Sequence, residues 1–154
     1  MTELNQLGPH FFVKVAAACF CGALIGLERQ LRGKPAGVRT SILVCLGCSL
    51  FIHLGALLQG AIDPTRVMGQ VITGMGFIGG GVILSRNGLV KGVTSAAVLW
   101  VLASIGAAIG LGFVAIAVYV TLVTLGILLG VERLESTFKA MTRGVHRHST
   151  NVEE

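Results

Sequence analysis

Charged residues are scarce in this 154-residue sequence, in which Asp, Glu, Lys and Arg together make up 12%. A water-soluble domain typically has about 25% charged residues. The chain therefore has too little polar surface to cover a globule in water, which excludes an ordinary soluble domain. Hydrophobic residues make up 53% of the sequence and the mean hydropathy is +0.83. The composition indicates a membrane protein.

Carboxylates are absent between Asp63 and Glu132, and this absence bears on a glycine-rich segment. Residues 74–81, GMGFIGGG, match the G-x-G-x-x-G pattern that holds the pyrophosphate of dinucleotides in soluble proteins. Such a site requires a preceding strand and an acidic residue about 20 positions further on. The sequence offers neither, so we expect these glycines to serve helix packing.

Catalytic patterns are also missing. The sequence has no nucleophile with a base beside it, no paired carboxylates and no zinc-ligand spacing. Cys45 and Cys48 share a helix face, but Cys19 and Cys21 point about 200° apart, so the four thiols are expected to pack as small apolar side chains. We therefore predict a non-enzymatic protein with no catalytic residue, no metal site and no cofactor.

Long apolar runs predict an all-α membrane protein. A hydrocarbon core of about 30 Å requires about 20 apolar residues per helix. Residues 93–131 contain no charge, and as one helix they would be about 58 Å long, so a break is expected at Gly110-Leu111-Gly112. The prediction is a compact glycine-packed bundle of five spans with a short cytoplasmic tail at 132–154. The spans are 11–27, 38–58, 66–85, 94–111 and 112–131.

The placement of cations predicts the orientation of this bundle. With five spans, ten of the twelve Lys and Arg residues fall on one side, which the positive-inside rule assigns to the cytoplasm. The amino terminus is then outside and the carboxyl terminus inside. The net charge of +5 comes from these loops and predicts contact with anionic lipid headgroups, not with nucleic acid.

Glycines recur with a spacing of four residues in four of the predicted spans. Such small-xxx-small patterns let helix backbones approach closely in lipid, within the bundle or between protomers. The third span is the richest, so we expect it to be the central helix. In an alternative interpretation, Gly79-Gly80-Gly81 opens the helix and exposes carbonyls to an ion. The predicted packing glycines are Gly22, Gly26, Gly76, Gly79, Gly80, Gly81, Gly106 and Gly110.

Polar residues at the outer side have two interpretations. Asp63 followed by Pro64 is typical of a helix start, with Asp as the cap. Alternatively, Asp63 meets Lys14, Arg66 or a cation from outside. We expect Lys14, one turn inside the first span, to extend its amine toward the interface.

At the inner side, Glu28 and Arg29 end the first span. An interfacial ion pair between Glu28 and Arg39 or Lys34 is expected, and a role in binding a cation or a partner protein is the alternative. Arg39 lies where it can reach a lipid phosphate or a carboxylate.

Three further positions lead to local predictions. Asn87-Gly88 could form a β-hairpin, but between two helices a left-handed helix cap is expected. Thr94 or Ser95 can cap the fourth span. Trp100 lies near the middle of its span and is either a packing residue or an anchor for a docked protein.

Three segments together resemble the transmembrane domain of the MgtC/SapB family of bacterial membrane proteins. They are GALIGLERQLRGKPAGVRT at 22–40, DPTRVMGQVITGMGFIGGGVIL at 63–84 and VKGVTSAAVLW at 90–100. Their order and spacing match the family as well. Members of the MgtC type continue into a soluble carboxyl-terminal domain, so the chain is expected to resemble a short SapB-like member without it.

The resemblance implies five helices in the bacterial inner membrane and a non-enzymatic role in adaptation to scarce magnesium and in virulence. It implies action through other membrane complexes, such as a proton-translocating ATP synthase. A homo-oligomer is expected, and an oligomeric cation channel or transporter is the alternative function. The residues carried over by motif position are Glu28, Arg29, Gly37, Arg39, Thr40, Asp63, Arg66, Gly76, Gly79, Gly81, Gly92, Thr94 and Trp100.

Overall fold

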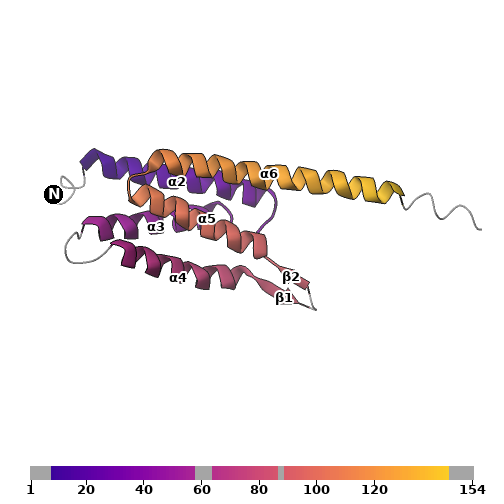
Figure 1. Cartoon of the computed structure of the whole chain (residues 1–154), viewed down its shortest axis with the longest axis horizontal. Helices are drawn as coiled ribbons and strands as arrows, with labels where there is room; N and C mark the ends of the chain where they lie inside the picture. The colour runs from indigo at the N-terminus through magenta and orange to yellow at the C-terminus, as the bar shows by residue number, and fades with distance from the viewer. Residues whose placement is uncertain (1–7, 58–63, 87–88, 146–154) are drawn as a thin grey trace, which may run out of the picture.

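Five helices and one short hairpin make up the part of the chain that the computed structural model describes, residues 8–57, 64–86 and 89–145 (Figure 1). Asp63 lies outside these residues, so the two interpretations of its role stay predictions. The helices are α2 (Gly8–Leu31), α3 (Val38–Leu57), α4 (Pro64–Val82), α5 (Val93–Gly110) and α6 (Val114–Val145).

Four of the helices are long and apolar enough to cross a membrane: His10–Leu31, Val38–Leu57, Val93–Gly110 and Val114–Val131. The third predicted span, α4, is not among the helices that are long and apolar enough. Its 19 residues include Arg66, Gln70 and six glycines, all of which lower its hydropathy. The protein is therefore an all-α membrane protein with five helices, four of which are clear candidate spans.

A β-hairpin follows α4, where a helix cap was expected. Strands β1 (Leu84–Arg86) and β2 (Leu89–Lys91) pair antiparallel, with Leu84 opposite Lys91. The preference for a cap was therefore wrong, and α4 ends three residues before the predicted boundary at 85. Asn87 and Gly88, which connect the two strands, lie outside the described residues.

The start of α5 also differs from the prediction. The cap is Gly92, with φ 94°, and no side chain caps the helix, so the expectation of a Thr94 or Ser95 cap was wrong. A Cβ atom at residue 92 would overlap the Val82 carbonyl oxygen, so only glycine fits where the hairpin returns to the end of α4. The first turn of α5 thus begins without a side-chain acceptor.

The predicted break between the last two spans lies at the other end of α5. That helix ends at Gly110, α6 begins at Val114, and Gly112 between them has φ 96°. Two helices therefore replace the single long one that the uncharged segment allows.

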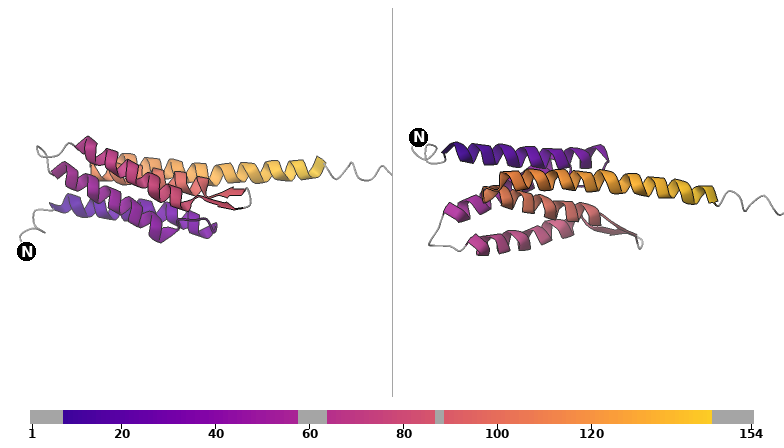
Figure 2. Two further views of the ribbon diagram at one scale, coloured as in Figure 1. Left: turned by 90° about the horizontal axis from the view of Figure 1, so that it is seen from below. Right: turned by 45° about the horizontal axis from the view of Figure 1, so that its top comes forward.

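The centre of the bundle is α5, not α4. Half of the α5 span is buried, and the helix packs against α2, α3, α4 and α6. Its buried side chains include Leu99, Leu102, Ile105 and Ile109. The main contacts of α4 are with α3 and α5, and it lies at the edge of the bundle (Figure 2). The prediction of a central α4 was wrong because glycine gives a helix little side-chain surface to bury.

Two helix pairs approach so closely that no side chain fits between them. A Cβ added at Gly22 would lie 2.8 Å from Ile42 Cα, and one at Gly26 would lie 2.6 Å from Val38 Cα, so α2 and α3 touch through their backbones. At Gly110 of α5 an added Cβ would lie 2.6 Å from the Ser49 carbonyl oxygen of α3, and at Gly106 it would overlap the Cys45 carbonyl oxygen. These contacts hold α3 between α2 and α5.

The glycines of α4 have different surroundings. An added Cβ at Gly79 would lie 3.7 Å from Ala96 Cβ, whereas at Gly76, Gly80 and Gly81 nothing described lies within 4 Å. Residues 79–81 are helical, so the alternative in which the helix opens there was wrong. Most of the α4 glycines are thus on the outer surface of the bundle.

Basic residues gather at one end of the bundle, which we call the basic end. The end of α2, the starts of α3 and α5 and the hairpin lie there, and α6 projects beyond the other helices in the same direction (Figure 1). The described cations of the basic end include Arg29, Arg32, Lys34, Arg39 and Lys91.

Candidate functional site: a buried ion-pair network and a basic cavity

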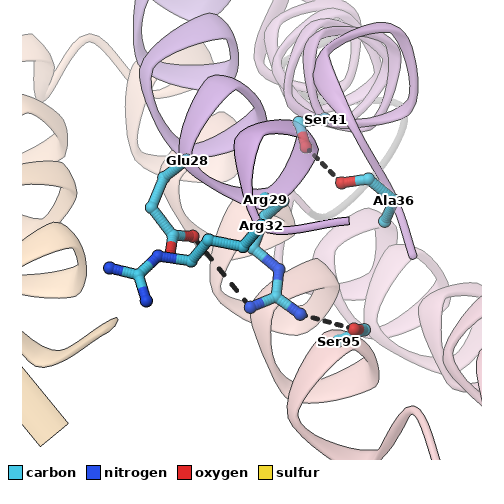
Figure 3. A network of polar contacts seen from close by, with 6 residues as sticks. All are labelled: Glu28, Arg29, Arg32, Ala36, Ser41 and Ser95. Atoms are coloured by element: carbon cyan, nitrogen blue, oxygen red, sulfur yellow. Dashed lines mark hydrogen bonds and ion pairs between the residues drawn. The ribbon is translucent and has the colours of Figure 1, made fainter. Parts of the chain in front are cut away.

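The last turn of α2 holds two buried charges side by side. The exposed fraction is 8% for Glu28 and 3% for Arg29. Glu28 Oε1 lies 2.7 Å from Arg32 Nε, and Glu28 Oε2 lies 4.0 Å from Arg29 Nη1 (Figure 3). The expected ion pair of Glu28 with Arg39 or Lys34 was wrong. Arg32 is one helical turn further along the same face and therefore within closer reach.

Arg29 connects α2 to the central helix. Its Nη2 donates a hydrogen bond of 2.6 Å to Ser95 Oγ in the first turn of α5 (Figure 3). This bond joins residues 66 positions apart and is buried. Two atoms of the network, Arg29 Nε and Glu28 Oε2, are buried without a described hydrogen-bond partner. The guanidinium thus has donor capacity that the described residues do not use.

A cavity of about 530 Å³ lies beside Arg29 at the basic end. It lies between two segments, namely the connection from α2 to α3 and the junction of β2 with α5. Three cations and no carboxylate are among the described residues that line it. Those residues are Arg29, Gly33, Lys34, Pro35, Val82, Lys91, Gly92, Thr94 and Ser95.

The connection between α2 and α3 shapes one wall of this cavity. Lys34 N donates to the Arg29 carbonyl oxygen at 3.0 Å, which turns the chain back at the end of α2. Ser41 Oγ donates to the Ala36 carbonyl oxygen at 3.2 Å (Figure 3). Val38 N donates to Gln30 Oε1 at 3.3 Å. These bonds fix the position of Lys34 relative to α2.

The remaining predicted site residues are spread over the surface. Arg39, Thr40, Arg66 and Thr94 are exposed, and only Thr94 reaches the basic cavity. Trp100 is 52% exposed and lines a separate, almost wholly apolar cavity of about 280 Å³ between α4 and α5. Of the eight predicted functional residues, the structure therefore brings Glu28, Arg29 and Thr94 into one region.

A second polar cluster lies at the opposite end of the bundle. Lys14 Nζ donates to the Gly110 carbonyl oxygen at 2.9 Å and lies 3.1 Å from His53 Nδ1. Lys14 therefore lies between α2, α3 and α5 at the end of the bundle where α5 terminates, and its extension toward the interface stays a prediction. The last carbonyls of a helix lack intrahelical partners and attract cations, which explains the contact with Gly110.

No three described His, Cys, Asp or Glu side chains lie close enough to hold a metal ion. The basic cavity has the wrong charge for a cation and the right charge for an anion.

An apolar groove of about 660 Å³ runs between α3 and α4. Thr40, Phe51 and Gln70 are among its lining residues. On the far side of α4, four small residues form a line that we call the α4 stripe. They are Gly69, Thr73, Gly76 and Gly80.

The α4 stripe follows helical spacing, at positions i, i+4, i+7 and i+11, so its members share one face of α4. All four residues are exposed, and none of the three glycines has a described atom within 4 Å of an added Cβ. Gly79 and Met75 point toward α5 instead. The stripe therefore faces away from the bundle.

Two members of the basic region were not predicted from the sequence. Ser95 was expected only as a possible helix cap, and Lys91 was one of the ten cations assigned to the cytoplasmic side. A signal was available in VKGVTS at 90–95, where a cation, a glycine turn and hydroxyl groups precede a long apolar run.

The sequence is similar to those of a known protein family. The model of the MgtC family matches residues 15–137. The chain is 42% identical over 146 residues to the "Putative magnesium transporter YhiD" of Escherichia coli (strain K12), which covers 90% of the chain and 66% of that protein. It is 39% identical over 139 residues to "Protein MgtC" of Brucella abortus (strain 2308), which covers 88% of the chain and 58% of that protein.

Protein MgtC of Salmonella typhimurium is 41% identical over 112 residues, which are 73% of the chain and 48% of that protein. The chain thus spans about half to two thirds of the length of these relatives. No solved structure matches it significantly. The family model covers most of the sequence, and the chain belongs to the MgtC family.

Proposed function

We propose that this chain is a non-enzymatic protein of the bacterial inner membrane that supports adaptation to low magnesium by docking other membrane proteins. The positive-inside rule favours an orientation with the basic end in the cytoplasm, because Arg29, Arg32, Lys34, Arg39 and Lys91 gather there. The amino terminus is then periplasmic and the carboxyl terminus cytoplasmic. A role in virulence is part of the same proposal, because the family resemblance implies it.

The α4 stripe is the observation that supports docking. Lipid tails are as apolar as leucine, so helices in a bilayer associate through close backbone contact. Each glycine in a helix costs about 1 kcal/mol relative to alanine. At Gly22 and Gly26 a tight contact with α3 offsets this cost, whereas at Gly69, Gly76 and Gly80 nothing described is in contact. A second helix placed against the stripe would supply the missing contact.

The proposed occupant is a transmembrane helix of a larger membrane complex. A neighbouring helix fits a stripe of small residues, because the backbone of α4 is accessible at each of them. The membrane part of a proton-translocating ATP synthase is the partner that the family resemblance suggests. Assembly of the chain with itself would use the same type of contact.

The test is affinity purification of the tagged chain from membranes of cells grown at low magnesium. Gly76→Leu with Gly80→Leu places two bulky side chains on the stripe, at positions where no described atom lies within 4 Å of an added Cβ. Gly126→Leu is the matched control, since Gly126 of α6 is also exposed and has no described atom within 4 Å of an added Cβ. The stripe variant should lose most of its co-purified membrane partner, and the control should retain it. Equal recovery from the two variants would refute docking at the stripe.

A second candidate function is an oligomeric cation channel or transporter. The name of the Escherichia coli relative, "Putative magnesium transporter YhiD", favours it. Magnesium flux into proteoliposomes that contain the purified chain, lost on Asp63→Ala, would support transport. Vesicles that stay tight to magnesium would leave docking as the function.

A further inference from the structure

The geometry points to a binding site for a phosphate group in the cavity at the basic end. Arg29, Lys34 and Lys91 would neutralise the anion, and the first turn of α5 would donate hydrogen bonds to it. The inference does not depend on docking at the α4 stripe, which lies on another part of the surface.

The charges around the cavity are unbalanced. Arg29, Lys34 and Lys91 line it, and no carboxylate does so among the described residues. Glu28, the nearest described acid, lies 2.7 Å from Arg32 Nε and 4.0 Å from Arg29 Nη1. The shorter contact neutralises Glu28 chiefly through Arg32, so the Arg29 charge is only weakly compensated. A buried cation of this kind requires a partner.

Arg29 is built into the wall of the cavity. Only 3% of Arg29 is exposed, and its Nε has no described hydrogen-bond partner. The bond of 2.6 Å from Nη2 to Ser95 Oγ holds the guanidinium in place. A fixed guanidinium with unused donors matches the geometry of a phosphate, to which arginine can donate two hydrogen bonds at once.

The start of α5 adds a second source of attraction. The first N–H groups of a helix have no intrahelical acceptor, and the helix dipole favours an anion beside them. α5 has 18 residues, and its cap, Gly92, supplies no side-chain acceptor. Thr94 and Ser95 of the first turn line the same cavity as the three cations. The three cations and the start of α5 therefore both attract an anion into the same cavity.

The size and place of the cavity define the ligand class. About 530 Å³ accommodates a phosphate together with part of the molecule that bears it. The cavity lies at the end of the bundle, where lipid headgroups would meet it. Two sources share this chemistry, namely free phosphate and the headgroup phosphate of an anionic lipid.

The test uses the full chain in phosphatidylcholine nanodiscs, with the Tm of unfolding as the readout. In one arm inorganic phosphate is titrated at constant ionic strength against chloride. In the other arm phosphatidylglycerol replaces part of the phosphatidylcholine. The Tm of the chain should rise in at least one arm, because a ligand that binds the folded state stabilises it. A rise with phosphate identifies free phosphate as a ligand, and a rise with phosphatidylglycerol alone identifies the lipid.

Two variants show whether the cavity is responsible. Lys34→Gln with Lys91→Gln removes two exposed cations of the cavity, and Arg39→Gln removes an exposed cation of the basic end that does not line it. Each variant is compared with its own Tm without ligand. The double variant should require at least about tenfold more ligand for the same rise in Tm, because it has lost charge-assisted contacts. Arg39→Gln should respond like the unchanged chain. Absence of a Tm rise in both arms, or an equal loss in Arg39→Gln, would overturn the site.

Discussion

Replacement of Gly22 by alanine tests the close backbone contact between α2 and α3. An added Cβ at this position would lie 2.8 Å from both Ile42 Cα and the Ser41 carbonyl oxygen. Carbon atoms make favourable contact at roughly 3.5 Å, so the two helices would have to separate by about 0.7 Å. The obstructing atoms belong to the α3 backbone, and a change of side-chain rotamer cannot relieve the clash.

The cost of this separation follows from packing energetics. A gap of about 0.5–1 Å loses roughly a quarter to a half of the dispersion attraction between the atoms concerned. Overpacking of a close-packed interior costs about 1–3 kcal/mol. Alanine also favours a helix by about 1 kcal/mol relative to glycine. That second contribution is common to every Gly→Ala change inside a helix, so a control can remove it.

Gly126→Ala is this control. Gly126 lies within α6, is exposed, and has no described atom within 4 Å of an added Cβ. The free energy of unfolding should therefore be about 1–3 kcal/mol lower for Gly22→Ala than for Gly126→Ala. Reversible unfolding in detergent, followed by circular dichroism, measures the difference. Equal stabilities of the two variants would show that α2 and α3 are not in backbone contact.

Two further predictions address the buried network and the orientation. Ser95→Ala leaves the buried Arg29 Nη2 without its acceptor and should lower the free energy of unfolding by about 1–3 kcal/mol. Ser104→Ala should change it by less than about 0.5 kcal/mol, because Ser104 is exposed and bonds only to its own helix, and similar losses would contradict the structural role of the Arg29 bond. In spheroplasts, a membrane-impermeant thiol reagent should label Phe113→Cys but label Lys34→Cys only after permeabilisation. The reverse pattern would invert the proposed orientation.

Local features of the fold were predictable from the sequence. Apolar runs of about 20 residues located the helices, because each must satisfy its own backbone inside lipid. The pair Gly110 and Gly112 located the break before α6, because a single helix there would exceed the thickness of the bilayer. The hairpin of β1 and β2, by contrast, was not predicted, because a helix cap is the usual structure between two adjoining helices.

Long-range features were not predictable. The bond from Arg29 to Ser95 spans 66 positions and that from Lys14 to Gly110 spans 96. A helix that is apolar on every side carries no pattern that tells which face meets which neighbour, and α3 and α5 are of this kind. The basic cavity depends on such pairings. Arg29 was found as a candidate by motif, but its partner Ser95 required the structure.

The proposed docking surface is tested most directly by photo-crosslinking in living cells at low magnesium. A photoreactive amino acid in place of Phe77, which is 88% exposed and lies beside Gly80 on α4, samples the surroundings of the α4 stripe. The same amino acid in place of Tyr119, which is 68% exposed on α6, is the control. The account predicts a discrete adduct with another membrane protein from position 77 and none from position 119. Adducts only with lipid or with a second copy of the chain, or the same adducts from both positions, would contradict it.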